Sequence, residues 1–138
     1  MQLVVLGLNH KTVPVDIREQ FAISPYSARS GLIHLDEQEG IEEAVVLSTC
    51  NRTEIYAVLK DETAKETLYD FFLALSGNSE AKDEYFFYFE GEACIRHLFE
   101  VVSGLDSMVI GESQILNQIK TAYTMALEEK ATRTILNT

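Results

Sequence analysis

Apolar residues gather in short runs along this chain, and the spacing within each run predicts strands that alternate with helices. Residues 2–8 are predominantly apolar and rich in branched side chains, which predicts a buried strand ending at the polar residues 9–11. Residues 44–49 form a second apolar run, and residues 54–60 alternate between two faces, as a strand does. Residues 84–89 are rich in aromatic side chains and predict a fourth strand.

Helical spacing fills the intervals between these strands. A short helix is expected over 15–22, and a second begins at Ser24, where serine suits the N-cap and proline the first turn, and ends by Gly40. A third helix is expected over 62–75. The side chains expected to face inward are Ala28, Leu32 and Leu35 in the second helix and Leu68, Phe71, Phe72 and Leu75 in the third.

The resulting order, β-α-α-β-β-α-β, is that of an α+β, ferredoxin-like fold, a split β-α-β sheet of four antiparallel strands with helices on one face. We expect one domain, with this core over 1–90 and a helical extension over 91–138. The extension is predicted to hold helices at 92–103 and 113–130. Their expected inward stripes are Ile95, Leu98, Phe99 and Val102, and then Ile115, Ile119, Ala122 and Ala126.

Composition narrows the class of protein. The 138-residue chain has a formal net charge of −11, which argues against a free-standing nucleic-acid binder but leaves room for a local basic site. No apolar run approaches the ~20 residues of a membrane span, and no basic segment precedes the first apolar run as in a secretory signal. We therefore expect a cytoplasmic protein without a membrane partner. Residues 131–138 carry no stop signal, which fits equally a frayed terminus or a longer protein.

Cys50 is the first candidate for chemistry. It lies in STCNRTE, directly after an apolar run, so that a strand leads into a turn carrying the thiol beside Arg52. The permanent charge of arginine favours the thiolate, which is the nucleophilic form of cysteine. The alternative is that Cys50 is a small apolar residue packed at the end of a strand.

The histidines and the second cysteine give weaker signals. His10 follows the first strand and is either a site residue or a surface histidine. His97 is three positions after Cys94, but two ligands are too few for structural zinc, and without CxxC or HExxH patterns we expect no metal. From the local sequence alone His97 is better explained as a satisfied, partly buried histidine, and Cys94 is expected to be inert packing.

Small polar groups are dense in residues 104–114, ahead of the last predicted helix. A helix start offers free N–H groups to anions, and the Glu112 carboxylate could hold an ammonium group. Ser113 is a plausible N-cap, and capping alone is the simpler explanation of this segment.

Four stretches together closely resemble the N-terminal catalytic domain of the glutamyl-tRNA reductase family, in order and over nearly the whole chain. They are GLNHKTVPVDIRE (7–19), STCNRTE (48–54), HLFEVVSGLDSMVIGESQI (97–115) and NQIK (117–120). This resemblance implies an enzyme that uses NADPH to convert glutamyl-tRNA to glutamate 1-semialdehyde, the first step toward 5-aminolevulinate and tetrapyrroles.

The resemblance also implies roles for individual residues. The family's catalytic cysteine falls on Cys50, whose thiolate would form a thioester with the glutamyl group, and its essential histidine falls on His97. An arginine beside the nucleophile suits a substrate carboxylate, and Glu112 suits the substrate's amino group. The positions that fall on the family's substrate-binding residues are Thr49, Asn51, Arg52, Ser107, Glu112, Ser113, Gln114 and Gln118.

The resemblance further implies parts that this sequence does not contain. The family continues into a Rossmann domain that binds NADPH and a helical dimerisation domain, and no Gly-rich dinucleotide fingerprint follows a strand here. We therefore expect this chain to be acylated at most, and expect a homodimer, and a partnership with the aminomutase of the next step, only for the longer enzyme. The alternatives are a non-catalytic ligand- or RNA-binding ferredoxin-like module, which the acids around 85–88 disfavour for RNA, and an assembly fragment.

Overall fold

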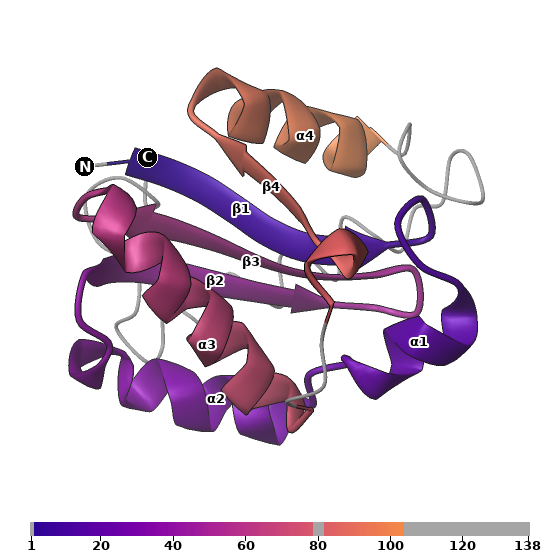
Figure 1. The fold of residues 1–138 in the computed structure, drawn as a ribbon, viewed down its shortest axis with the longest axis horizontal. Helices are drawn as coiled ribbons and strands as arrows, with labels where there is room; N and C mark the ends of the chain where they lie inside the picture. Colours follow the sequence, from indigo (N-terminus) through magenta and orange to yellow (C-terminus); the bar gives the residue numbers. More distant parts are fainter. Residues whose placement is uncertain (1, 79–81, 104–138) are drawn as a thin grey trace.

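A computed structural model describes residues 2–78 and 82–103 of the chain (Figure 1). Its strands are β1 Gln2–Asn9, β2 Ile41–Ser48, β3 Arg52–Leu59 and β4 Phe87–Glu90. Its helices are α1 Val15–Gln20, α2 Pro25–Ile33, α3 Lys65–Ser76 and α4 Glu92–Ser103, with short 3-10 turns at Leu35–Glu37, Glu62–Ala64 and Asp83–Tyr85. None of the described helices is long and apolar enough to cross a membrane.

The strands form one four-stranded sheet in the order β2-β3-β1-β4, and every neighbouring pair is antiparallel. This order and the helical crossovers are those of the split β-α-β, ferredoxin-like fold, so the predicted fold class is confirmed. In the register of the sheet, Asn9 at the end of β1 stands opposite Arg52 at the start of β3. The end of β1 and the β2–β3 hairpin therefore lie at the same edge of the molecule.

Helices α2 and α3 cover one face of the sheet and enclose the main core with it (Figure 1). The inward residues predicted for both helices are buried, and Ile55, Ala57 and Leu59 of β3 face the same core. The N-cap of α2 is Ser24, whose Oγ accepts from the Ser27 N–H at 3.1 Å, and α3 ends at Gly77, which has a φ of 73°. Local capping and hydrophobic spacing thus determine this layer.

Helix α4 packs on the opposite face of the sheet (Figure 1). Cys94 contacts Val5 and Tyr56, and Val101 contacts Leu47. The inward stripe predicted for this helix is wrong: Ile95, Leu98, Phe99 and Val102 are 44%, 36%, 69% and 40% exposed. The buried stripe is instead Cys94, His97 and Val101, because the sheet beneath it presents a buried carboxylate that binds a histidine.

The aromatic stretch before α4 also differs from the prediction. Residues 84 and 85 belong to a 3-10 turn, and β4 begins only at Phe87. Phe86 packs edge-on against Phe21, Tyr69 and Phe72, with ring centroids 5.7, 5.2 and 5.2 Å apart. The first part of the aromatic run therefore anchors the main core, and only the second part pairs with β1.

Candidate active site

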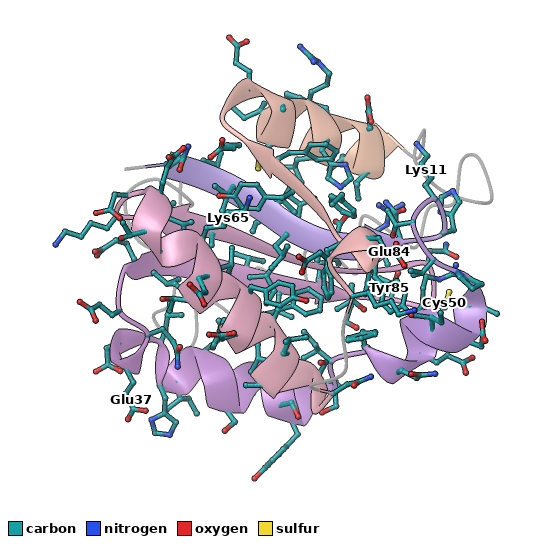
Figure 2. All side chains as sticks on the ribbon, viewed as in Figure 1. Lys11, Glu37, Cys50, Lys65, Glu84 and Tyr85 are labelled. Atoms are coloured by element: carbon teal, nitrogen blue, oxygen red, sulfur yellow. The ribbon has the colours of Figure 1, made fainter. Side chains whose placement is uncertain are left out.

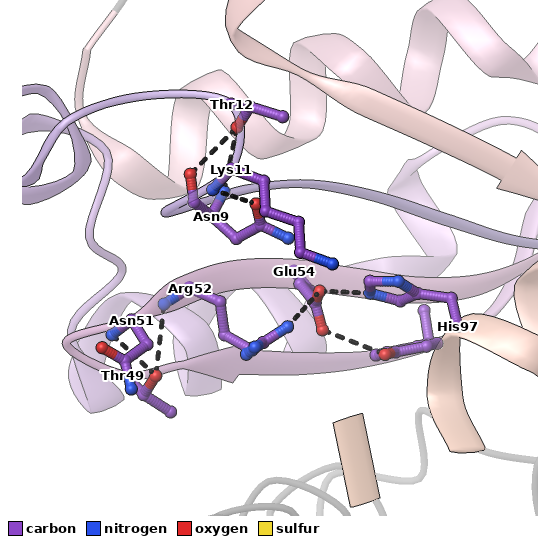
Figure 3. A network of polar contacts seen from close by, with 9 residues as sticks. Asn9, Lys11, Thr12, Thr49, Asn51, Arg52, Glu54 and His97 are labelled. Atoms are coloured by element: carbon purple, nitrogen blue, oxygen red, sulfur yellow. Dashed lines mark hydrogen bonds and ion pairs between the residues drawn. The ribbon is translucent and has the colours of Figure 1, made fainter. Parts of the chain in front are cut away.

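The β2–β3 hairpin carries Cys50 at its tip. The Thr49 N–H donates to the Arg52 carbonyl at 2.7 Å, which closes a tight turn around Cys50 and Asn51. The Thr49 hydroxyl accepts from the N–H groups of Asn51 and Arg52 at 3.1 and 3.3 Å (Figure 3). A side chain of the turn thus binds the backbone of the turn, as threonine commonly does, and fixes the conformation around Cys50.

The two cysteines have opposite environments. Cys50 is exposed at the edge of the molecule (Figure 2), whereas Cys94 is buried under α4 at 1% exposure. Burial, and secondarily the charge of Glu54, raise the pKa of the Cys94 thiol to about 12. Cys94 is therefore protonated at neutral pH and matches the packing role expected for it, while Cys50 is the thiol that solvent reaches.

Arg52 turns its side chain inward from the hairpin. It is 1% exposed, and its Nη1 donates to Glu54 Oε2 at 3.3 Å, within a fully buried ion pair. Arg52, Glu54 and Tyr56 alternate along β3 and share the sheet face that α4 covers. Figure 3 shows Arg52 and Glu54 on this face, beside His97. The predicted substrate-binding arginine is thus part of a buried polar network in this structure.

Glu54 is the centre of that network, and it was not among the predicted site residues. Its Oε1 accepts from the Tyr56 hydroxyl at 2.9 Å, and its Oε2 lies 2.5 Å from His97 Nε2 as well as near Arg52. The side chain is fully buried, so each of these donors compensates part of the cost of removing a carboxylate from water. The signal available for Glu54 was that polar side chains occupy three alternate positions of β3, at Arg52, Glu54 and Tyr56, ahead of a histidine on a predicted helix.

The environment of Tyr56 follows from the same carboxylate. Burial raises the pKa of Tyr56 far above its usual value, and the charge and hydrogen bond of Glu54 raise it further. Tyr56 is therefore a permanent hydrogen-bond donor to Glu54. This contact fixes one oxygen of the carboxylate and leaves the other for Arg52 and His97.

His97 projects from α4 toward this carboxylate and is 5% exposed. Its ring also packs against Phe87 and Phe89 of β4, with centroids 4.8 and 5.3 Å apart. The expectation of a partly buried, satisfied histidine is confirmed. Because Glu54 also accepts from Arg52 and Tyr56, we infer that it accepts from the Nε2–H of His97 as well.

The turn after β1 completes the described part of the site. The Asn9 N–H donates to the Thr12 hydroxyl at 3.0 Å, and Asn9 Oδ1 accepts from the Lys11 N–H at 2.9 Å (Figure 3). His10 lies within this turn and directly follows Asn9, which pairs with Arg52 across β1 and β3. The structure therefore brings the polar turn after β1 and the hairpin turn that carries Cys50 to the same end of the sheet.

Five of the predicted substrate-binding residues belong to a part of the chain that the structure does not describe. Ser107, Glu112, Ser113, Gln114 and Gln118 lie outside the described residues. Within 2–78 and 82–103, no group of three or more His, Cys, Asp or Glu side chains could hold a metal ion.

The fold and this edge define the class of protein: a ferredoxin-like domain that presents one exposed thiol on a fixed hairpin, next to a buried Arg-Glu-His network. Residues 6–138 match the family model described as "Glutamyl-tRNAGlu reductase, N-terminal domain". The chain therefore belongs to the glutamyl-tRNA reductase N-terminal domain family, as its resemblance implied.

Individual relatives agree with this assignment. The chain is 48% identical over 139 residues to a glutamyl-tRNA reductase of an Exiguobacterium species and 46% identical over 139 residues to that of Pelobacter propionicus, covering 99% of this chain in each case. It spans about a third of the length of these curated relatives, 31% and 32%. The solved glutamyl-tRNA reductase of Methanopyrus kandleri matches 98% of this chain and 30% of its own, with a TM-score of 0.78 and 30% identity.

Proposed function

We propose that this chain is the part of an NADPH-dependent glutamyl-tRNA reductase that takes the glutamyl group from tRNA onto Cys50. The longer enzyme would release glutamate 1-semialdehyde for 5-aminolevulinate and tetrapyrrole synthesis in the cytoplasm. The observation that carries this proposal is the exposed thiol of Cys50 on a hairpin held by Thr49, in a chain of this family.

The proposed step is a transfer from an oxygen ester to a thioester. The Cys50 sulfur attacks the carbonyl carbon of the glutamyl ester, a carbon–sulfur bond forms, and the bond from that carbon to the ribose oxygen breaks. The proton lost by the thiol is balanced by the proton that the ribose hydroxyl gains, so tRNA leaves intact. The acyl group is then held in a form that is easier to reduce than an ester.

We assign a proton-transfer role to His97. Glu54 orients the ring through Nε2, so a proton exchanged with the substrate moves through Nδ1. Carboxylate–imidazole pairs work in this way when the carboxylate fixes the tautomer and stabilises the imidazolium. Thr49 holds the hairpin, and Asn51 is assigned to the substrate.

Arg52 is assigned to bind the carboxylate of the substrate. In the structure, Arg52 forms an ion pair with Glu54. The further substrate contacts proposed from the family resemblance are Ser107, Glu112, Ser113, Gln114 and Gln118, in the part of the chain beyond the described residues.

NADPH does not fit the residues described. A dinucleotide needs backbone N–H groups at a glycine turn between a strand and a helix. Gly91 joins β4 to α4 in this way, but its N–H donates to the Leu3 carbonyl at 2.8 Å, and Glu90 and Glu92 flank it with negative charge. We therefore assign reduction, and with it NADPH binding, to a Rossmann domain outside this chain.

The remaining assignments concern the longer enzyme. We propose a ferredoxin-like core over 1–90 and a helical extension over 91–138 that leads toward that Rossmann domain. Dimerisation through a further domain and transfer of product to the aminomutase of the next step belong to the same proposal.

Transfer of labelled glutamate tests this proposal. The chain is mixed with glutamyl-tRNA carrying radiolabelled glutamate, treated with ribonuclease and precipitated, and the label on protein is counted. Wild type and Cys94→Ser should retain label and Cys50→Ser should not. Equal label on wild type and Cys50→Ser would exclude the proposed nucleophile.

A further inference from the structure

A pocket with a volume of about 290 Å³ opens beside His97, between β4, α4 and the turn after β1. Phe87 and Phe89 form its aromatic wall, and Asn9 forms its border toward the hairpin. Because Asn9 is the strand neighbour of Arg52, the pocket lies at the same edge of the sheet as Cys50. Lys11 and Cys50 are seen at this edge in Figure 2.

The aromatic wall offers ring faces on which a flat ligand can stack. The rings of Phe87 and Phe89 are 5.3 Å apart at an angle of 31°, and the ring of His97 lies against both. Phe89 is 36% exposed, so this stack is not closed off by the core. Nucleobases stack on exposed aromatic faces of this kind, whatever their sequence.

The charge of the pocket differs from that of the chain. Lys11 and Arg96 line it with two cations against the single carboxylate of Glu100, in a chain with a net charge of −11. Aromatic faces next to basic side chains are the combination that binds single-stranded nucleic acid, stacking the base and neutralising the phosphate. The acids near Phe87 along the chain had predicted acidic surroundings, but Lys11 and Arg96 reach the pocket from other elements.

We propose that this pocket binds the 3′-terminal nucleoside of the tRNA, with its base against Phe89 and Phe87 and its phosphate near Lys11 and Arg96. This assignment rests on the proposed function, since the terminal ribose carries the glutamyl ester that Cys50 attacks. Binding the nucleoside beside His97 places the ester at the edge of the sheet where the hairpin lies.

Binding of an uncharged RNA end tests the pocket without any chemistry at Cys50. The probe is a fluorescently labelled CCA trinucleotide, titrated with the chain at low salt and followed by anisotropy. Phe89→Leu should weaken binding about tenfold, the usual effect of losing one stacking face. Arg96→Gln should weaken binding and reduce its salt dependence. Phe99→Leu is the matched control, because Phe99 is on the same helix as Arg96 but outside the pocket and 69% exposed.

Three binding results would each overturn the assignment: no binding of the trinucleotide by folded wild type, equal binding by wild type and Phe89→Leu, or tighter binding of NADP⁺ than of the trinucleotide at this pocket. Acylation separates this proposal from the proposed function. If glutamyl-tRNA acylates Cys50 equally fast in wild type and Phe89→Leu, the pocket assignment is wrong and the proposed function stands. If Cys50 is never acylated but CCA binding depends on Phe89, the pocket stands as an RNA site and the proposed function is wrong.

Discussion

Glu54 Oε2 lies 2.5 Å from His97 Nε2, a contact between β3 and α4 that joins residues 43 positions apart in the chain. Both side chains are buried, and the same carboxylate holds Arg52 and Tyr56. A buried carboxylate is tolerated only with such partners, so α4 can cover this face of the sheet only in the register that brings His97 over Glu54. One contact therefore sets the position of the helix and the orientation of the proposed proton-transfer group.

Replacing Glu54 should separate these two roles. Glu54→Gln keeps the size and part of the hydrogen bonding but removes the charge, so we expect acylation of Cys50 to slow at least tenfold while the fold is retained. Glu54→Ala leaves Arg52 buried without its carboxylate and should lower the free energy of unfolding by about 3 kcal/mol. Urea denaturation and acylation rates measure the two effects. An unchanged acylation rate in Glu54→Gln would show that the carboxylate serves the fold alone.

Gly7 is a second position from which the network can be disturbed. A Cβ there would lie 2.7 Å from the Thr53 carbonyl oxygen, 2.8 Å from Glu54 Cγ and 3.0 Å from Phe87 Cζ. Gly7→Ala should therefore displace Glu54, lower stability by about 1–3 kcal/mol and slow acylation. Gly77→Ala is the comparison, since its cost of about 1–2 kcal/mol comes only from a φ of 73°, with open space around the new methyl group. Equal acylation rates in the two variants would contradict this prediction.

Substitutions of Thr49 test whether acylation of Cys50 requires the hydrogen bonds that fix the hairpin turn. Thr49→Val removes the oxygen that accepts from two N–H groups, while Thr49→Ser keeps it. We expect the valine variant to lose about 1–2 kcal/mol of stability and to be acylated more slowly, and the serine variant to resemble wild type. Hydrogen exchange at the Asn51 and Arg52 amides would report the loss of order directly. Similar exchange in the valine and serine variants would rule out the hydroxyl as the support.

Alkaline pH should weaken the fold through Cys94. Its pKa is raised from 9.0 to about 12 in the folded state, so between these values the unfolded chain releases a proton that the folded chain retains. Unfolding thus becomes more favourable as pH rises from about 9 to 12, and stability is lost over that interval. Cys94→Ala should be less stable at pH 7 but should lose less with rising pH. Parallel stability curves for the two proteins between pH 9 and 11 would show that Cys94 does not contribute.

The fold was predictable where local signals determine it. The alternation of residues 54–60 assigned the faces of β3 correctly, and Ser24 marked the start of helix α2. Phe86 was misplaced in a strand because its partners Phe21, Tyr69 and Phe72 come from distant elements. A run of aromatic residues is equally compatible with a β-strand and with a non-strand segment whose rings pack into the core.

The site was predictable only in its exposed part. Cys50 and its hairpin follow from a local turn, but the buried face of α4 does not, because Ile95, Leu98, Phe99 and Val102 form a more apolar stripe than the one that is buried. The buried carboxylate of Glu54 on β3 needs His97 as a partner, and this contact determines which face of α4 is buried. The hydrophobic pattern of α4 alone does not reveal such a contact with another element. Glu54 itself was missed because a charged residue in an alternating strand is usually a solvent-facing one.

The most direct measurement is the intact mass of the chain after incubation with glutamyl-tRNA, with and without hydroxylamine, for wild type, Cys50→Ser and Cys94→Ser. The account predicts a single glutamyl adduct on wild type and Cys94→Ser that hydroxylamine removes, and none on Cys50→Ser. An adduct that persists in Cys50→Ser, or a folded wild-type chain that binds glutamyl-tRNA and remains unmodified, would contradict the assignment of Cys50 as the acyl acceptor of this domain.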